Sequence, residues 1–487
     1  MLLAAVDLGS NSFRLEIGRV DGDHILTQGY WKETVRLAGG LDEEMRLSKK
    51  TMDAAIETLA RMNERLRGLP AAQVRAVGTQ TMRLATNAPE FLIRAQAALG
   101  YPIEVIAGRE EARLVFEGCT HTLPLSTARR LVVDIGGAST ELIVGRGFAA
   151  ESAESFKVGC VNTSVRFFKD GRIDRASLKR AEVAVAAELE ESVNVFSRSQ
   201  WDEAYGSSGT VGAVSAILRA QGWSDGTITS SGLLRLRQFL LQTGEIRRLK
   251  IEGLKTDRQE VIAGGVAVLS AVFDVLGLDE MKTARGALRV GLLYDLLGRR
   301  ESRDVRDATV DRMQQRLGVD REQAARVAQM AAGFHAALDA AAPDDHIKTL
   351  AWAAALHEAG FVISHSDHHK HGAYLIRNSD MAGFSTPDQE RIATLVLAQR
   401  GNLKKVASFI ADRNAANKIL ALRLAVLMLH ARRPVKLPAW SLRSTRAGAD
   451  LAIDRTWLGR HPLTQYLLEE EAALWERAGL PLRLIGS

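Results

Sequence analysis

Hydrophobic and polar positions follow two different patterns along this chain of 487 residues. In the first 300 residues, short apolar runs bounded by Gly, Ser and Asp predict strands, and apolar spacings of three and four predict helices. The predicted helices are 48–67, 88–99 and 175–197, and the predicted strands are 73–77, 103–106 and 204–210 with its turn. This alternation is typical of a mixed α/β layer architecture.

Beyond about residue 300 the strand signals become rare, and the pattern is almost wholly helical. Helices are predicted at 322–341, 350–358, 390–400 and 415–430, from apolar periodicity and alanine-rich composition. We therefore expect one domain boundary near residue 300 and a weaker one near residue 400.

Two segments of the first 300 residues repeat one another. Residues 7–18 read DLGSNSFRLEIG and residues 134–145 read DIGGASTELIVG, and a gapless alignment matches Asp, Gly, Ser, Leu and Gly. Apolar runs flank each copy, which predicts a strand, a Gly/Ser turn and a second strand. The copies start 127 residues apart, a domain-scale spacing. The repeat therefore predicts two similar α/β domains that face each other.

The composition fits an ordinary globular protein of three or four domains. Hydrophobic residues make up 46% and charged residues 25%, which excludes disordered, collagen-like and small disulfide-rich classes. The two cysteines, Cys119 and Cys160, fit a reducing cytoplasm without a disulfide framework or a zinc pattern. The apolar start is too short for a signal peptide, and no stretch is expected to reach the roughly 20 apolar residues of a membrane helix. We expect a cytoplasmic protein with no membrane partner.

The two hairpin tips carry the first candidate chemistry. Gly, Ser and Asn leave backbone N–H groups open to an anion, and the acids that begin the tips, Asp7 and Asp134, can hold Mg²⁺ that bridges to phosphate oxygens. One such turn is more often a plain β-turn, whereas two matched copies favour a cleft for a phosphoryl chain. A third turn, GSSGT at 206–210, follows a strand and precedes a helix, an arrangement that binds anions but is weak alone.

These three turns resemble the phosphate and adenosine motifs of the actin, sugar kinase and heat-shock chaperone superfamily. More closely, the chain resembles the exopolyphosphatase and guanosine pentaphosphate phosphohydrolase family. The motifs that carry this resemblance are DLGSNSFRL at 7–15, GTQTMR at 78–83, GREEARLVFEG at 108–118, DIGGASTEL at 134–142, GSSGT at 206–210, GALRVG at 286–291 and LHEAGFVISHSDHHKHGAYLIRNSD at 356–380. They cover nearly the whole chain, and GREEARLVF together with DIGGASTEL is highly specific.

The resemblance implies a fold and a division into domains. The fold would be α/β, with two facing actin-like (ribonuclease H-like) domains followed by an all-α HD-like C-terminal region. The expected domains are actin-like domain I at 1–122, actin-like domain II at 123–299, a helical HD-like domain at 300–399 and a basic C-terminal helical domain at 400–487.

The resemblance also implies which groups act on phosphate. The general base of the family is the second Glu of the EEAR motif, here Glu111. A carboxylate beside phosphates is expected to have a raised pKa, which lets it accept a proton from water near neutral pH. Arg83 and Arg258 match arginines that lie near the phosphates, where a planar guanidinium can neutralise two oxygens. We expect Arg83 to be catalytic together with Glu111, and Arg258 to bind phosphate. The alternative for Glu111 is a place in an ordinary charged helix start. The alternative for Arg83 and Arg258 is a solvated surface charge.

Residues around the tips complete the implied site. Asp134 and Glu141 match metal-associated acids of the family, and Asp7 from the first tip is a further expected metal ligand. Ala138 stands where many relatives have a third Gly. The expected phosphate-binding residues are Ser10, Asn11, Gly136, Gly137, Ala138, Ser139, Gly209, Thr210 and Arg258. The implied cofactor is Mg²⁺ or another divalent ion, and a requirement for a monovalent cation is left open.

A histidine-rich segment marks the helical part. Five of the eleven histidines lie between His357 and His371, in a region that resembles HD-type phosphohydrolase domains. The expected His-Asp pair is replaced by His357-Glu358, and His335 and Asp380 are unsettled partners. We therefore expect a structural or substrate-channel role rather than metal catalysis, with a cationic patch at 368–371.

Basic residues concentrate near the C-terminus. The whole chain has a net charge of +6, yet residues 400–460 contain 13 Lys and Arg against 3 Asp, a local charge of +10. A solvated helix face would interleave both signs, so the segment indicates a polyanion-binding surface, with Lys404, Lys405, Arg432 and Arg433 as expected contacts. Because no aromatic ladder accompanies the cations, specific nucleic-acid binding is not expected, whereas inorganic polyphosphate needs only charge.

Four hypotheses on function follow. The first is an exopolyphosphatase that releases terminal orthophosphate from inorganic polyphosphate by Mg-dependent in-line hydrolysis, processively. The alternative is hydrolysis of guanosine pentaphosphate (pppGpp) to the tetraphosphate, or both activities. The third hypothesis, from a different class, is an ATP-binding kinase or nucleotide switch, which the EEAR motif disfavours. The fourth is a catalytically silent polyphosphate-binding protein. The family usually pairs through its C-terminal parts, so a homodimer is expected.

Overall fold

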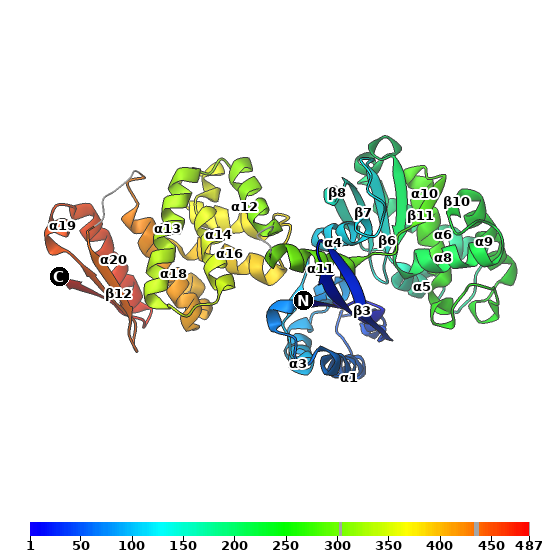
Figure 1. The fold of residues 1–487 in the computed structure, drawn as a ribbon, viewed down its shortest axis with the longest axis horizontal. Helices are drawn as coiled ribbons and strands as arrows, with labels where there is room; N and C mark the ends of the chain where they lie inside the picture. The colour runs from blue at the N-terminus through cyan, green and yellow to red at the C-terminus, as the bar shows by residue number, and fades with distance from the viewer. Residues whose placement is uncertain (301–303, 433–437, 487) are drawn as a thin grey trace. The chain divides into compact units, whose positions relative to one another are not determined.

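The computed structural model describes residues 1–300, 304–432 and 438–486. It divides the chain into two compact units, Met1–Asp304 and Val305–Ser487. The first unit is mixed α/β and the second is mainly helical (Figure 1). The finer division at residues 122 and 399 remains a prediction.

The first lobe of unit Met1–Asp304 is a five-stranded sheet of order β3-β2-β1-β4-β5. Strand β1 is antiparallel to β2 and parallel to β4, and almost all its side chains are buried because layers cover both faces. The elements are β1 Leu2–Leu8, β2 Ser12–Asp21, β3 His24–Thr34, η1 Leu37–Gly40, α1 Lys49–Leu66, β4 Val74–Gly78, α2 Gln80–Leu84, α3 Ala88–Leu99 and β5 Ile103–Val105. The predicted helices and strands in this stretch are confirmed within two residues.

The second lobe is a six-stranded sheet of order β10-β11-β9-β6-β7-β8. Its elements are β6 Arg130–Ile135, β7 Thr140–Arg146, β8 Ala149–Phe156, α5 Cys160–Phe167, α6 Arg175–Glu190, α7 Val193–Phe196, β9 Glu203–Ser207, α8 Ser208–Ala220, β10 Ile228–Thr229, α9 Ser230–Thr243, η5 Thr256–Val261, α10 Ile262–Leu276 and β11 Glu280–Thr283.

The two sheets share one topology. Each has an antiparallel hairpin with a third strand on one side and a parallel strand on the other, β3-β2-β1-β4 in one and β8-β7-β6-β9 in the other. The register also agrees, because Asp7 lies opposite Arg14 and Asp134 opposite Glu141. The duplicated actin-like fold is therefore confirmed.

Two helices lie between the sheets: α4 (Gly108–Thr120) and α11 (Leu288–Arg300) (Figure 1). They cross in close contact, because a Cβ on Gly118 would stand 2.2 Å from the Ala287 carbonyl oxygen. A Cβ on Gly291 would stand 1.8 Å from the Leu114 carbonyl oxygen. Only glycine permits this approach, which explains the last glycine of the GREEARLVFEG motif and the last glycine of the GALRVG motif.

Helix α10 corrects the expectation that no stretch could span a membrane. The segment Thr256–Leu276 is long and apolar enough to do so, with a mean hydropathy of 1.6. In the structure, 72% of that apolar window is buried, and Val266, Leu269 and Val272 have no exposed surface. A core helix that is apolar all round meets the same length and composition test.

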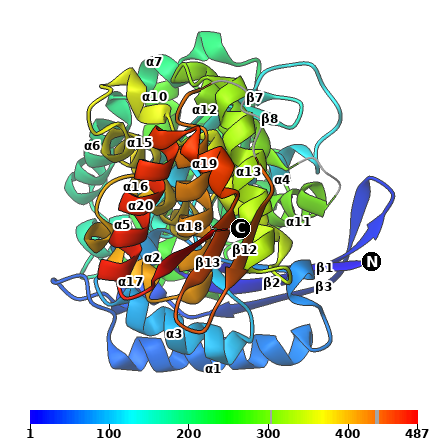
Figure 2. The same ribbon diagram turned by 90° about the vertical axis from the view of Figure 1, so that its left-hand side faces the viewer.

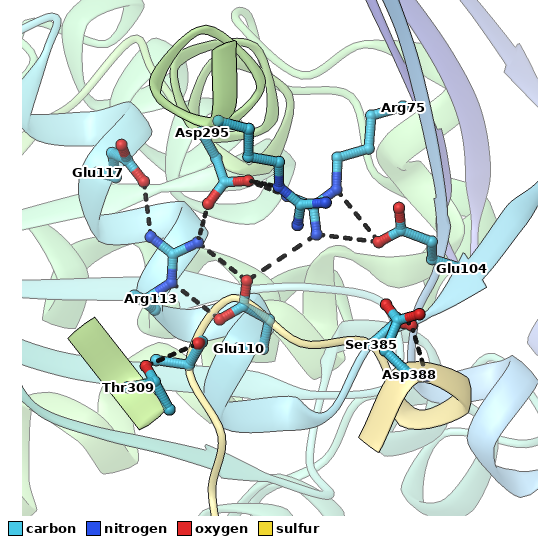
Figure 3. Close-up of polar contacts among 11 residues, drawn as sticks. Arg75, Glu104, Glu110, Arg113, Glu117, Asp295, Thr309, Ser385 and Asp388 are labelled. Atoms are coloured by element: carbon cyan, nitrogen blue, oxygen red, sulfur yellow. Dashed lines mark hydrogen bonds and ion pairs between the residues drawn. The ribbon is translucent and has the colours of Figure 1, made fainter. Parts of the chain in front are cut away.

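A buried network of charges fixes α4 against α11 and the first sheet (Figure 3). Its centre is Asp295 of α11, whose carboxylate accepts hydrogen bonds from Arg75 Nη1 at 2.6 Å and Arg299 Nε at 2.7 Å, and from Arg113. Burial alone would raise the pKa of Asp295, but the three guanidinium groups hold it well below its usual range. The other carboxylates of the network are Glu104, Glu110 and Glu117.

Replacing Asp295 with asparagine is expected to lower the free energy of unfolding by about 3–5 kcal/mol, the usual cost of breaking a buried ion pair. The folded-state pKa of Asp295 is lowered, so its stabilisation is present above the unfolded pKa of about 3.9 and is lost as the pH falls below it. Urea unfolding followed by circular dichroism should show a difference from wild type that is largest near neutral pH and shrinks below about pH 4.

Asp53 offers a matched control, because its side chain is 35% exposed whereas that of Asp295 is buried. Asp53 has two cationic partners, Lys49 and Arg94, and water screens such pairs. Asp53→Asn should therefore leave the unfolding midpoint nearly unchanged. If Asp295→Asn and Asp53→Asn lowered the free energy of unfolding equally, burial of the Asp295 network would contribute nothing to stability.

Unit Val305–Ser487 confirms the helical prediction and adds a small sheet. Its helices are α12 Val305–Arg316, α13 Arg321–Leu338, α14 Asp344–Ala355, α15 His368–Arg377, α16 Thr386–Ala398, α17 Ala407–Ile410, α18 Arg413–Met428, α19 Arg455–Gly459 and α20 Pro462–Arg477, with η7 at Leu403–Val406.

The description of this region as all-α needs one correction. Strands β12 Trp440–Ser444, β13 Ala449–Ile453 and β14 Leu482–Gly486 form a three-stranded sheet, visible beside α20 in Figure 2. Its buried residues Leu442, Leu451 and Leu482 join one core with Trp475 of α20. The strands have five residues each and their partner is distant in sequence, which gives only a weak periodic signal.

Candidate active site

The hairpin tips of the two lobes face each other across a cleft in unit Met1–Asp304. A Cβ on Gly137 of the second tip would lie 3.4 Å from the Cβ atoms of Ser10 and Asn11 of the first. The cleft lies at the carboxyl ends of the parallel strands, where open α/β sheets bind ligands. Its lining includes Asp7, Gly9, Ser10, Asn11, Ser12, Arg14, Thr79, Glu111, Val115, Asp134, Ile135, Gly136, Gly137, Ser139, Glu141, Ser208, Gly209, Arg258, Ala287 and Leu288.

The first tip is held from behind by hydrogen bonds. Ser10 Oγ accepts a bond of 2.7 Å from Thr81 Oγ1. The Asn11 carbonyl oxygen accepts backbone N–H bonds from Val35 and Arg36, at 3.1 and 2.8 Å. Ser10 and Asn11 therefore reach the cleft from a fixed backbone, as the phosphate-binding prediction requires.

The second tip presents two acids that are neighbours across the β6–β7 hairpin, Asp134 and Glu141. The tip is fixed by a bond of 2.9 Å from the Gly136 N–H to the Ser139 carbonyl oxygen, and Ser155 Oγ donates to Glu141 Oε1 at 2.8 Å. Of the predicted phosphate-binding residues on this tip, Ala138 is buried and does not line the cleft.

The third turn joins β9 to α8 and completes the cleft. Ser208 has a positive φ of 75°, and Gly209 lies directly beneath the Arg258 guanidinium, since a Cβ there would stand 1.9 Å from Nη2. Arg258 therefore lines the cleft beside the N-terminus of α8, and helix N-termini favour anions. Thr210 is buried and stands outside the lining.

Glu111 is brought to the cleft by the first turn of α4. Its Oε2 accepts a hydrogen bond of 3.0 Å from Arg83 Nη1, which also donates to the Ile106 carbonyl oxygen at 2.8 Å. Arg83 thus lies behind Glu111 and outside the cleft lining, whereas the sequence placed it beside the phosphates. Its position suits it to orient Glu111.

Four carboxylates concentrate negative charge in the cleft. Burial raises the pKa of Glu111 to about 7, against the opposing effect of Arg83 and with contributions from Asp7 and Asp134. Burial also raises the pKa of Asp134 to about 6. The pKa of Glu141 lies well above its usual range because of burial, Glu111 and Asp134.

This donor set fits a divalent cation that is completed by phosphate oxygens. Among the described residues no group of three or more His, Cys, Asp or Glu forms a ready metal cage. Mg²⁺ typically takes only one or two carboxylates and fills its remaining positions with water and substrate phosphates. Asp7 and Asp134 at the starts of facing tips can supply these two carboxylates. A cation there would relieve the repulsion from Asp7, which adds to the effect of burial on the pKa of Asp134.

Arg14 is a cleft residue that the motifs did not single out. Its Nη1 lies 3.4 Å from Asp7 Oδ2, and it occupies the repeat position that Glu141 holds in the second copy. The first tip therefore pairs its aspartate with a cation, and the second pairs its aspartate with an acid. The gapless repeat alignment already contained this signal. Thr79 and Ser208 also line the cleft without having been predicted.

The predicted polyanion-binding residues lie in unit Val305–Ser487. Lys404 is exposed, and Lys405 donates to the Arg400 carbonyl oxygen. Arg432 is tied to Glu358 and Asp320. Arg433 lies outside the described residues.

Part of the +10 charge is engaged inside the unit. Arg423 is buried and forms a two-pronged ion pair with Glu471, and Lys418 is also buried. Arg413 Nη2 donates to Ser444 Oγ and to the carbonyl oxygens of Thr445 and Gly448. The exposed cations of the segment include Lys404, Arg443, Arg446, Arg455 and Arg460.

The histidines of the HD-like segment are not a cationic patch as a group. His357, His368 and His369 are buried, and burial lowers the pKa of His357 and of His369 to about 4. His357 and His369 are therefore neutral at pH 7, so His369 adds no charge to the expected cationic patch at 368–371, where Lys370 is exposed.

Solved structures with a similar fold include an exopolyphosphatase from Cytophaga hutchinsonii, 24% identical with a TM-score of 0.56, matched over 61% of this chain and 98% of that one. An exopolyphosphatase-like protein is 25% identical with a TM-score of 0.56, over 62% and 98%. A Ppx/GppA family member from Aquifex aeolicus is 23% identical with a TM-score of 0.51, over 62% and 98%. These similarities agree with the two-lobed fold.

Family membership rests on two further matches. The model of the Ppx/GppA phosphatase family matches residues 17–300. That of Ppx/GppA phosphatase domain III matches residues 305–472. Together they span both units, and the chain therefore belongs to the Ppx/GppA phosphatase family.

Proposed function

We propose that this phosphoanhydride hydrolase is an exopolyphosphatase that releases the terminal orthophosphate of inorganic polyphosphate. The observation that carries the proposal is the buried carboxylate of Glu111, which lines the cleft between the two facing tips. A pKa of about 7 is close to the ideal for a general base that works near neutral pH.

The reaction needs a water molecule in line with the bond that breaks. Glu111 takes a proton from that water, whose oxygen bonds to the terminal phosphorus while the bond from phosphorus to the bridging oxygen breaks. The shortened polyphosphate leaves with the bridging oxygen. Arg258 over Gly209 is placed to neutralise charge on the terminal phosphoryl oxygens, and Arg83 holds Glu111 in position.

Mg²⁺ is part of the proposal, with Asp7 and Asp134 as the residues that would hold it. When bound, the ion would neutralise phosphate oxygens and so stabilise the charge of the transition state. Glu141 would accept a hydrogen bond from water in the cleft.

The cleft is large enough for a terminal phosphoryl group but not for a whole nucleotide. Its cavity volume is about 60 Å³, whereas pockets for ligands with the bulk of a nucleotide enclose roughly 300 Å³ or more. A terminal phosphoryl group fits, and the rest of the substrate extends outside. As part of the same proposal, the exposed cations of the basic segment, including Arg443, Arg446 and Arg455, hold a long polyphosphate, which would favour repeated cleavage without release. A homodimer, which light scattering would test, belongs to the same proposal.

The decisive experiment measures orthophosphate release from long polyphosphate, short polyphosphate and pppGpp, each with Mg²⁺ and with excess chelator. We expect Mg-dependent release from long polyphosphate at the highest kcat/KM. Negligible release from long polyphosphate, combined with efficient turnover of pppGpp, would reject the exopolyphosphatase assignment in favour of the pentaphosphate phosphohydrolase.

A further inference from the structure

Two ion pairs bridge the lobes of unit Met1–Asp304 beside the cleft. Lys32 Nζ of β3 lies 2.7 Å from Asp257 Oδ2. Arg36 Nη2, just after β3, lies 2.8 Å from Glu260 Oε2. Both acids belong to η5 of the second lobe, the short helix that also carries Arg258. The two pairs therefore bracket Arg258, one position before it and two positions after it.

The first-lobe ends of these pairs are connected to the first tip. Lys32 lies opposite Arg14 in the β2–β3 register. Arg36 has a left-handed backbone with a φ of 55°, and its N–H donates to the Asn11 carbonyl oxygen at 2.8 Å. A strained φ of this kind in a non-glycine residue persists only where the surroundings impose it. The segment that holds Arg36 therefore moves with the first tip.

The second-lobe ends are connected to the third turn. The Arg258 guanidinium lies against Gly209, and its backbone N–H donates to the Lys255 carbonyl oxygen at 3.0 Å. The two ion pairs hold η5 close to the first lobe on both sides of Arg258. If the pairs broke and the lobes separated, η5 would move with the second lobe, and this guanidinium would move away from the first tip.

We propose that Lys32, Arg36, Asp257 and Glu260 form an electrostatic latch that closes the two lobes and sets Arg258 opposite the first tip. They are positioning residues, since none of the four lines the cleft. The latch itself stands on the ion pairs alone, and only its effect on catalysis rests on the proposed function.

The exposure of these side chains suits a reversible latch. Those of Lys32 and Asp257 are 25% and 38% exposed, and those of Arg36 and Glu260 are 58% and 66% exposed. Exposed pairs are individually weak and are screened by salt. Weak pairs can break in each catalytic cycle to admit substrate and release orthophosphate, as closing elements of enzymes do.

The first arm of the test measures lobe separation without any substrate. Spin labels on Glu57→Cys of α1 and Gln238→Cys of α9, both exposed positions, report the interlobe distance, because the native Cys119 and Cys160 are buried and label poorly. We expect one dominant distance in the otherwise unchanged protein. Lys32→Glu combined with Arg36→Glu should broaden the distribution and lengthen its mean.

The second arm is a charge swap. Lys32→Glu alone should lengthen the mean interlobe distance and lower kcat/KM for long polyphosphate by about 2- to 5-fold, the upper part of the range for an exposed ion pair. Lys32→Glu with Asp257→Lys should restore both the rate and the distance. Arg46→Glu, on an exposed residue of the first lobe that carries the same charge change, is the matched control and should alter neither.

The outcomes separate the latch from the proposed function. The latch would be overturned if the interlobe distance distribution were unchanged in Lys32→Glu with Arg36→Glu. It would also be overturned if Asp257→Lys failed to restore the distance and the rate that Lys32→Glu alone changes. Restored distances in a protein that releases no orthophosphate from any phosphoanhydride would keep the latch and reject the proposed function.

Discussion

Replacement of Glu111 by glutamine is expected to reduce orthophosphate release by about 10²- to 10⁴-fold, the contribution of a well-placed general base. Glutamine keeps the shape of the side chain and can still contact Arg83, 3.0 Å away in the wild type, but it cannot accept a proton from water. The measurement is steady-state kcat on long polyphosphate, together with polyphosphate affinity by isothermal titration calorimetry.

Affinity for polyphosphate should stay close to wild type in Glu111→Gln, because the tips and Arg258 are untouched. Glu90→Gln is the matched control, since Glu90 is an exposed glutamate in the first turn of α3. It reproduces the charge change at a helix start without touching the cleft, and it should keep full activity. Turnover of Glu111→Gln within a few-fold of wild type would remove Glu111 as the base.

The two tips were predictable because the signal was local and duplicated. Asp7 and Asp134 each end a buried strand and begin a turn of small residues, and the same pattern occurs twice at domain spacing. The equal registers of the two hairpins follow directly from this repeat, as the pairs Asp7–Arg14 and Asp134–Glu141 show. The glycines at the α4–α11 crossing carried part of the family resemblance. Glycine is needed there because the two helices approach each other closely, and only the three-dimensional structure shows this approach.

Side-chain direction was not predictable from the motifs. Arg83 and Arg258 both looked like phosphate ligands, yet Arg83 turns back to Glu111 while Arg258 lies in the cleft. Which of two arginines reaches a site depends on the neighbours that compete for it, here the Ile106 carbonyl and the Gln80 side chain. Linear sequence does not contain these contacts.

The basic segment shows the same limit for charge. The charge count for residues 400–460 treats every cation as free. Arg423, however, forms a buried ion pair with Glu471, which lies outside residues 400–460. The surface that could hold a polyanion is therefore smaller than the local charge of +10 suggests.

Replacement of Gly159 by alanine is expected to lower kcat by about 10²-fold, although Gly159 is not among the residues that line the cleft. Gly159 precedes α5 with a φ of −149°, a conformation open to any residue, so only space is at issue. An alanine Cβ would stand 2.6 Å from the Gly137 carbonyl carbon and 2.7 Å from the Ala138 nitrogen. These atoms belong to the backbone of the second tip, which must shift, and a displacement of about 1 Å can cost 10²-fold in rate.

Gly212→Ala separates this effect from the general consequence of adding a methyl group. Gly212 lies inside α8, with no atom within 4 Å of the added Cβ, so the variant should keep full activity and gain about 0.5–1 kcal/mol of stability from helix propensity. Circular dichroism and thermal unfolding would confirm that Gly159→Ala remains folded while kcat falls. If Gly159→Ala turned over long polyphosphate as fast as Gly212→Ala, the position of the second tip could not be what limits hydrolysis, and the role assigned to the facing tips would have to be given up.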